Sequence, residues 1–102
     1  MNIDKHFGIQ NLSEAIYTVS GVSIFDICGR SKRDNVNYSR KVYIYVLMND
    51  FGISIDGIAA LTQRDRTSIY WYVHNMSGWL KWDKKFSIML KSVKNQANRL
   101  YK

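Results

Sequence analysis

The chain has 102 residues, of which 46% are hydrophobic, and a formal net charge of +7. This is the length of one domain, so we expect residues 1–102 to form a single unit, and the apolar share excludes a disordered tail. The excess of Lys and Arg favours a polyanionic partner, because neutralised phosphates release condensed counterions. No apolar run is long enough to span or anchor in a membrane, and no secretion signal is present, so we expect a cytoplasmic protein without a membrane partner.

The first part of the chain predicts a loose end followed by two helices. Residues 1–8 show no clear period, and we expect them to be loose. From Ile9 onward apolar residues recur every three or four positions, which predicts a helix. Ser23 is placed to cap a second, short helix that Gly29 ends. Cys28 is the single cysteine and lies in an apolar run, which favours a small buried thiol.

Residues 29–41 have the composition of a basic loop, with Gly, Ser, Asn and Asp and little apolar content. Such a loop is either solvated or follows a phosphate backbone and inserts an arginine into a narrow minor groove. The overall charge and the downstream helix pair make us favour contact with nucleic acid. The cations of this segment are Arg30, Lys32, Arg33, Arg40 and Lys41.

Residues 42–48, VYIYVLM, are the most apolar run and fit two structures. The β-branched residues alternate with tyrosines, as they do in a strand. No second strand of similar character follows, however, and a single strand cannot satisfy its own backbone hydrogen bonds. We therefore expect a buried central helix from Ser39 to about Asn49.

The segment 54–76 has the spacing of two helices joined by a tight turn. Ser54 is a plausible N-cap of the first helix. From Asp65 the apolar period resumes, and Ile58 and Ile69 are far enough apart to close one helix onto the other across a turn of three or four residues. The alternative is a helix pair of any small α-domain, with its charges merely solvated.

The second helix of this pair presents a polar and aromatic face. If its apolar residues point inward, Thr67, Trp71 and His74 lie on the opposite side. The front end of such a helix normally enters the major groove, and its free N–H groups suit a phosphate. The candidate base contacts are Arg64, Asp65, Arg66, Thr67, Ser68 and Trp71. The candidate phosphate or minor-groove contacts are Arg30, Lys32, Arg33, Arg40, Lys41 and Ser54.

The last part of the chain predicts one more helix. Gly78 is placed to end the preceding helix, and we expect Trp79 and Trp82 to pack on the core rather than stack on bases. Asp83 caps a helix of about residues 83–98 with apolar residues at helical spacing. Its other face carries Lys84, Lys85, Lys91 and Lys94, which form either a solubilising surface or a second phosphate patch.

Taken in order, the basic loop, the buried helix and the helix pair resemble the C-terminal DNA-binding domain of the bacterial chromosomal replication initiator DnaA. The most specific part is residues 64–69, RDRTSI, which are similar to the family signature Arg-Asp-His-Thr-Thr-Val. The resemblance covers about residues 21–76. It implies a small all-α, Trp-repressor-like domain of about six helices with a helix-turn-helix.

The resemblance also implies roles for individual residues. Asp65, Arg66 and Thr67, with Ser68 beside them, would read bases in the major groove. Arg30 or a near neighbour would enter the minor groove, and phosphates would be held by Lys32, Arg33 and Arg40. Three departures matter. Arg66 replaces the family's histidine, so its base preference does not carry over, and the turn is one residue shorter than the family's. The family's nucleotide-binding module is absent, so we expect a free-standing domain of this kind.

These observations predict a non-enzymatic protein that binds double-stranded DNA, in replication-origin recognition or in transcriptional regulation. No Gly-rich phosphate loop, acidic metal cluster or catalytic His and Cys arrangement is present, so we expect no nucleotide cofactor, no metal and no catalytic residue. The alternative is a protein-interaction adaptor or inhibitor, because Tyr70, Trp71 and Tyr72 are unusually aromatic for a DNA-reading helix and protein interfaces favour Trp, Tyr and Arg.

Overall fold

The computed structural model describes residues 5–101, and the side chains of residues 8–98. In that range the chain forms six helices and no strand, which confirms the predicted all-α class. The helices are α1 (Lys5–Ser20), α2 (Ile24–Cys28), α3 (Asp34–Asn49), α4 (Ile55–Thr62), α5 (Arg66–Trp82) and α6 (Lys84–Tyr101).

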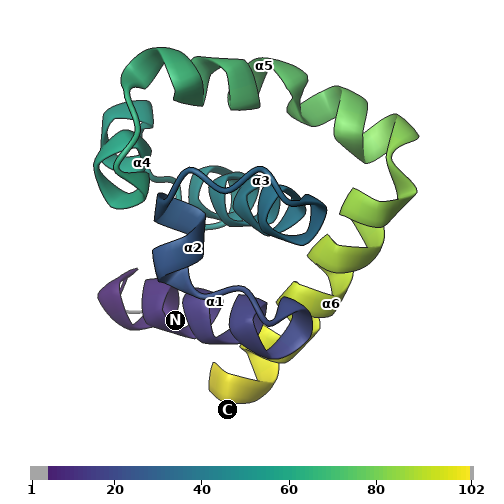
Figure 1. Cartoon of the computed structure of the whole chain (residues 1–102). Coiled ribbons are helices and arrows are strands. Elements are labelled where there is room, and N and C mark those ends of the chain that lie inside the picture. Colours follow the sequence, from purple (N-terminus) through teal and green to yellow (C-terminus); the bar gives the residue numbers. More distant parts are fainter. Residues whose placement is uncertain (1–4, 102) are drawn as a thin grey trace.

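The helix α3 runs through the middle of the molecule and contacts the other five helices (Figure 1). Its apolar residues are buried on nearly every side, and a helix satisfies its backbone hydrogen bonds internally, which explains why this run does not form a strand. The buried residues of α3 are Val36, Ser39, Arg40, Val42, Tyr43, Ile44, Val46 and Leu47.

Two predicted boundaries in the first half of the chain were wrong. The helix α3 begins at Asp34 rather than Ser39, so the loop before it covers only residues 29–33. Asp34 at the first turn is favourable to the helix dipole, and the buried Val36 anchors that turn. The helix α1 begins at Lys5, so the loose end expected for residues 1–8 does not extend beyond residue 4, and residues 1–4 lie outside the described part.

The caps that the sequence predicted for α2 and α4 are present. The Ser23 hydroxyl accepts a hydrogen bond from the backbone N–H of Asp26 at 3.2 Å, and the Asp26 carboxylate accepts one from the backbone N–H of Ser23 at 3.4 Å. This reciprocal pair is a capping box. The Ser54 hydroxyl accepts from the backbone N–H of Gly57 at 3.1 Å at the start of α4. Each cap fixes where its helix begins.

The helices α4 and α5 are joined by residues 63–65, within the predicted length for the turn. Gln63 takes the left-handed conformation with φ of 54°, and the backbone N–H of Arg64 donates to the carbonyl of Ala59 at 3.0 Å. This pattern closes the last turn of α4. Ile58 and Ile69 are fully buried, as expected of the residues that close one helix onto the other.

The helix α5 does not end at Gly78, as predicted, but continues to Trp82. The reason is Trp79, whose ring packs 6.0 Å from the ring of Tyr72 and 5.5 Å from that of Phe86, so the core holds the helix beyond the glycine. Asp83 then caps α6 as predicted, accepting from the backbone N–H of Phe86 at 3.2 Å. Trp82, which was expected in the core, is 82% exposed.

Candidate nucleic-acid interface

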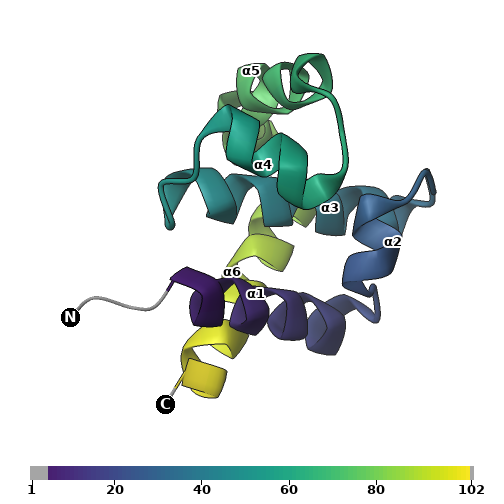
Figure 2. The same ribbon diagram turned by 90° about the vertical axis from the view of Figure 1, so that its left-hand side faces the viewer.

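A groove of about 670 Å³ lies where the loop 29–33, the first turns of α3 and the first turns of α5 meet. Figure 2 shows the α2–α3 loop and the α4–α5 connection on the same side of the molecule. The structure therefore brings the basic loop beside the start of the second helix of the pair, although the two segments are far apart in the sequence. The groove is lined by Arg30, Ser31, Lys32, Asn37, Arg40, Arg64, Ser68, Trp71 and Tyr72.

Arg40 is at the base of the groove and is only 4% exposed. Its Nε donates to the carbonyl of Ile27 at 2.8 Å, and its Nη2 donates to the carbonyls of Gly29 and Ser31 at 3.2 Å each and of Asp26 at 3.4 Å. These bonds engage the Nε and Nη2 of Arg40 with the loop backbone, so the guanidinium fixes the path of the loop. Its contact with a phosphate stays a prediction.

Arg64 performs the same task from the α4–α5 turn. Its Nη2 donates to the carbonyl of Gly29 at 2.7 Å and approaches that of Ile27 at 3.5 Å. Its Nε is buried without a hydrogen-bond partner, and burial, followed by the charge of Arg40, lowers the pKa of its guanidinium. Neither arginine forms an ion pair with a described residue. Arg64 therefore ties the turn to the loop through its Nη2, and its contact with a base stays a prediction.

The three remaining cations of the loop are exposed, as predicted. Arg30 and Lys32 line the groove, and Arg33 precedes the first turn of α3. Lys41 was grouped with them in the sequence but does not line the groove. Its Nζ lies 5.0 Å from the ring centroid of Tyr38 and 4.8 Å from that of Trp79, further along α5.

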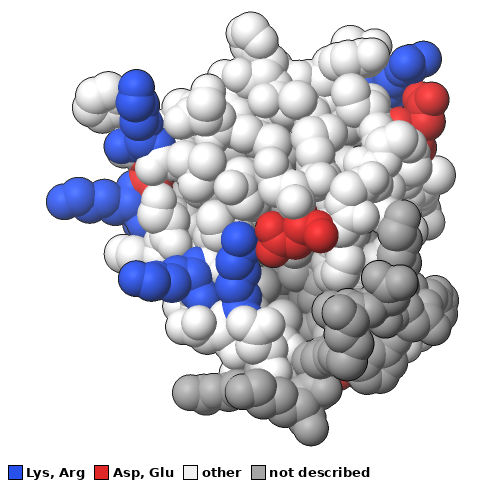
Figure 3. Space-filling model, turned by 180° about the vertical axis from the view of Figure 1, so that it is seen from behind, with Lys and Arg blue, Asp and Glu red and all other residues white. Residues whose placement is uncertain are grey.

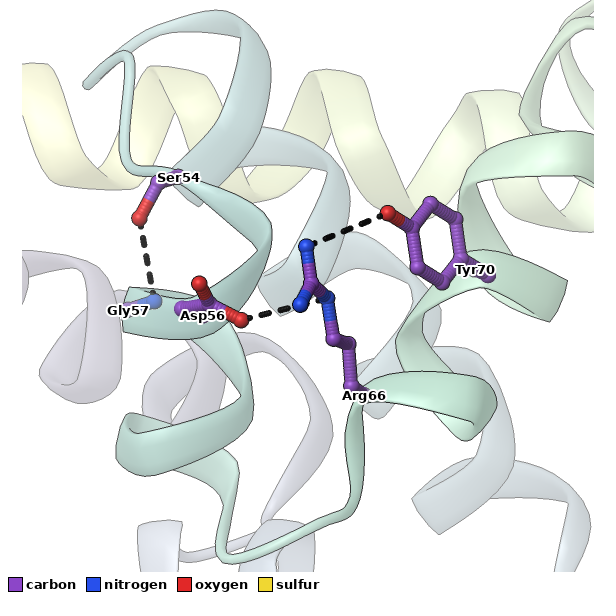
Figure 4. Close-up of polar contacts among 5 residues, drawn as sticks. All are labelled: Ser54, Asp56, Gly57, Arg66 and Tyr70. Atoms are coloured by element: carbon purple, nitrogen blue, oxygen red, sulfur yellow. Dashed lines mark hydrogen bonds and ion pairs between the residues drawn. The ribbon is translucent and has the colours of Figure 1, made fainter.

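The first residues of α5 divide between capping and exposure. The Asp65 carboxylate accepts from the backbone N–H of Ser68 at 2.7 Å, so it caps the helix. Arg66 extends toward the start of α4, where its Nε lies 3.3 Å from an oxygen of Asp56 and its Nη2 lies 3.4 Å from the hydroxyl of Tyr70 (Figure 4). Both partners of the Arg66–Asp56 pair are well exposed, and such a pair contributes about 0–1 kcal/mol. Ser54 caps α4 and does not line the groove.

Thr67 and Trp71 lie on the surface of α5, as the helical period predicted. Trp71 is 55% exposed, and its ring is held at its inner edge by Tyr72 at 5.2 Å and by Trp79 at 6.0 Å. Ser68 is half-buried beside it in the groove. The partly exposed indole of Trp71 thus lines the groove together with the loop cations Arg30 and Lys32.

Three residues of the groove, Ser31, Asn37 and Tyr72, were absent from the predicted site residues. Asn37 was placed in a loop, and Tyr72 was assigned to the core. Extending the helical period of the apolar run back to Val36 would have placed Asn37 on the helix, one turn before Arg40, instead of in the loop. Tyr72 could not have been found from the sequence. It is a core residue, and a core residue that also lines a groove has the same apolar spacing as one that does not.

The face of the molecule seen from behind, relative to Figure 1, carries few charged side chains. Figure 3 shows Lys and Arg side chains at the edge where α5 passes into α6, while most of that face is uncharged. On α6, Lys94 lies 3.4 Å from a carboxylate oxygen of Asp50, and Lys84, Lys85 and Lys91 are exposed.

The chain matches no family model, no curated protein and no solved structure. None of the helices in residues 5–101 combines the length and apolar character needed to cross a bilayer. The described side chains include no cluster of three or more His, Cys, Asp or Glu suited to a metal ion.

Proposed function

We propose that this chain is a non-enzymatic protein that binds double-stranded DNA with a sequence preference, in replication-origin recognition or in transcriptional regulation. The observation that carries the proposal is the groove, where two exposed cations of the loop 29–33 lie beside the exposed start of α5. A helix in the major groove and an adjacent basic loop on the backbone need this juxtaposition. The resemblance of residues 64–69 to the signature of the DnaA DNA-binding domain supports the same arrangement.

In this mechanism most of the affinity comes from phosphates. Arg30, Lys32 and Arg33 are exposed on a loop that two arginines hold in place. Their contacts with the backbone release counterions, and they set the position of the protein without specifying the sequence. Arg30 is the residue that enters an adjacent minor groove.

Sequence preference comes from the exposed residues at the start of α5. Thr67 and Ser68 offer hydroxyl groups, and Trp71 offers an apolar edge to a thymine methyl group. Arg66 leaves Asp56 to contact a base. That exchange is favourable, since the exposed ion pair contributes at most about 1 kcal/mol, whereas a bidentate arginine–guanine contact discriminates by about 1–3 kcal/mol.

Selection of bound duplexes from a random pool tests the proposal, followed by titration of two variants on the selected and a scrambled site. Arg66→Ala is expected to relax the preference at one base pair by about 1–3 kcal/mol. Lys32→Ala is expected to weaken both duplexes alike and to reduce the salt dependence. Lys91→Ala, an exposed lysine on α6, is the matched control for charge. No enriched motif, or no effect of either variant, would show that the assigned face is wrong.

The second candidate is a protein-interaction adaptor, and exposed apolar side chains favour it. Phe25 on α2 and Ile88 on α6 are large, apolar and well exposed, and neither lines the groove. Surface residues of this kind mark protein contacts when they form a continuous patch. A gel shift on random duplex DNA at low and at moderate salt separates the candidates: binding that salt weakens supports DNA, and no binding at low salt supports the adaptor.

A further inference from the structure

The helix α5 carries a second exposed tryptophan that duplex binding does not use. Trp82 is 82% exposed at its last position, and Trp71 is 55% exposed near its beginning. The residues 71, 75, 78 and 82 recur at helical spacing, so they share one side of α5, the side of Trp71 in the groove. Gly78, between the two indoles, is exposed, and an added Cβ there would meet nothing within 4 Å. The stripe is therefore open from one tryptophan to the other.

Cations flank this stripe along its length. Arg30 and Lys32 lie at the groove end beside Trp71. Midway, the Nζ of Lys41 lies 4.8 Å from the ring centroid of Trp79, which is itself 6.0 Å from that of Trp71.

The far end of the stripe has a second lysine. The Nζ of Lys85 lies 6.0 Å from the ring of Tyr38, the same ring that Lys41 covers at 5.0 Å. The acidic groups near this ring are Asp34 and Asp83. Asp83 is already engaged, since it accepts from the Tyr38 hydroxyl at 3.0 Å and caps α6. Two lysines thus cover the half-buried rings of Trp79 and Tyr38 between the groove and the start of α6.

We propose that the stripe of α5 from Trp71 to Trp82, with Lys41 and Lys85 beside it, is a binding track for single-stranded nucleic acid. The two indoles stack on bases, and the lysines contact the phosphates between them. Proteins that bind single strands combine these two elements, because every base has a flat face and every nucleotide a charge. A duplex hides its base faces and offers nothing for Trp82 to stack on.

The length of the helix sets the length of strand that the track holds. Eleven residues at 1.5 Å each separate the two indoles by about 16 Å along α5. At about 3.4 Å per nucleotide of a stacked strand, this distance corresponds to about five nucleotide steps, and to fewer in an extended strand. A strand of three nucleotides reaches one indole, and a strand of six or more reaches both.

Fluorescence anisotropy with labelled oligothymidines of three, six and twelve nucleotides, at about 50 mM salt, tests the track. For the wild type, affinity is expected to rise steeply between three and six nucleotides. Trp82→Ala is expected to weaken binding of the two longer strands about tenfold and to leave the shortest strand unchanged. Trp82→Phe, which keeps a flat ring, is expected to restore most of the loss. Tyr17→Ala, an exposed aromatic residue on α1, is the matched control.

The track does not depend on duplex binding, and a duplex of about 20 base pairs separates the two proposals. Trp82→Ala is expected to change duplex affinity less than twofold. If the wild type ignores the duplex yet binds the longer strands through Trp82, the duplex proposal fails and the track stands. If Trp82→Ala binds the twelve-nucleotide strand like the wild type, the track is wrong and Trp82 serves another partner, such as a protein. If it weakens duplex and single strand by the same factor, the track is also wrong, because Trp82 then does not distinguish a single strand from a duplex.

Discussion

Arg40 shows how a single buried cation organises the groove. Its guanidinium donates to loop carbonyls and has no carboxylate partner among the described residues. Arg40→Ala removes these donors and leaves buried carbonyls unpaired, so we expect a loss of about 2–4 kcal/mol in the free energy of unfolding, measured by urea titration. Arg40→Lys is not expected to rescue stability, because one ammonium group cannot replace the fork of the guanidinium.

Lys32 is the matched control for Arg40, since it lines the same groove but is exposed. Lys32→Ala is expected to change the free energy of unfolding by no more than about 0.5 kcal/mol. Equal stability losses for the two variants would contradict a structural role that belongs to Arg40 alone. The sequence placed both residues in one basic loop, because composition does not reveal which cation a tertiary contact will bury.

Tyr43 makes the stability of the fold depend on pH in the alkaline range. Burial in the centre of α3 raises the pKa of its phenol to about 12 from a usual value of 10.0. The folded state therefore holds this proton more tightly than the unfolded state, so the stabilisation is complete below pH 10 and is lost as the pH rises towards 12. The loss is on the order of 2–3 kcal/mol.

Tyr43→Phe isolates this effect from the other tyrosines and the lysines. The variant is expected to lose less stability than the wild type between pH 10 and pH 12, as measured by urea unfolding at each pH. Below pH 9 the two curves should run parallel, because neither side chain titrates there. Parallel curves up to pH 12 would mean that the Tyr43 phenol ionises as easily in the folded state as in the unfolded chain.

The turn between α4 and α5 carries strain at one residue. Gln63 has a φ of 54°, a conformation that glycine adopts without the penalty of a Cβ. Gln63→Gly is therefore expected to raise the free energy of unfolding by about 0.5–1 kcal/mol, measured by thermal or urea unfolding. Ala60→Gly is the control within the same helix, and it should cost about 1 kcal/mol because helical backbone gains nothing from glycine. Destabilisation by both changes would contradict the strain.

Helix starts that a side chain caps were predictable from the sequence, and the other helix boundaries were less so. Ser23, Ser54 and Asp83 accept the expected backbone hydrogen bonds, because a cap depends on residues three positions apart. Gly78 was misjudged because the packing of Trp79 on Phe86 overrides the local preference of a glycine. The start of α3 was misjudged for a similar reason, since its polar first turn is held by burial of Val36.

The candidate site was predictable only where it depends on residues that are close together in the sequence. The exposed face of α5 follows from the helical period alone, so Thr67 and Trp71 were placed correctly. The meeting of the loop with that face depends on Arg40 and Arg64, which contact carbonyls at least nine residues away in the chain. Contacts of that range leave no mark in composition or spacing.

At the scale of the whole molecule, α6 closes the fold by packing on α1, α3 and α5. Phe86 is its fully buried anchor, with its ring 5.7 Å from that of Tyr45 and 5.5 Å from that of Trp79. Phe86→Ala is expected to lower the free energy of unfolding by about 3–5 kcal/mol, measured by urea titration, because it opens a cavity between three helices. Ile88→Ala, on the exposed side of α6, should lie within about 0.5 kcal/mol of the wild type. A small change in the free energy of unfolding for Phe86→Ala would mean that the packing of α6 contributes little to the stability of the fold.

The loop 29–33 is already ordered in the free protein, because Arg40 and Arg64 donate to its carbonyls from two different elements. In the proposed complex this loop would therefore lose little conformational entropy on binding, unlike a segment that folds on its partner. The two arginines would then favour recognition indirectly, because they keep the loop that carries Arg30 and Lys32 at a fixed position relative to α5.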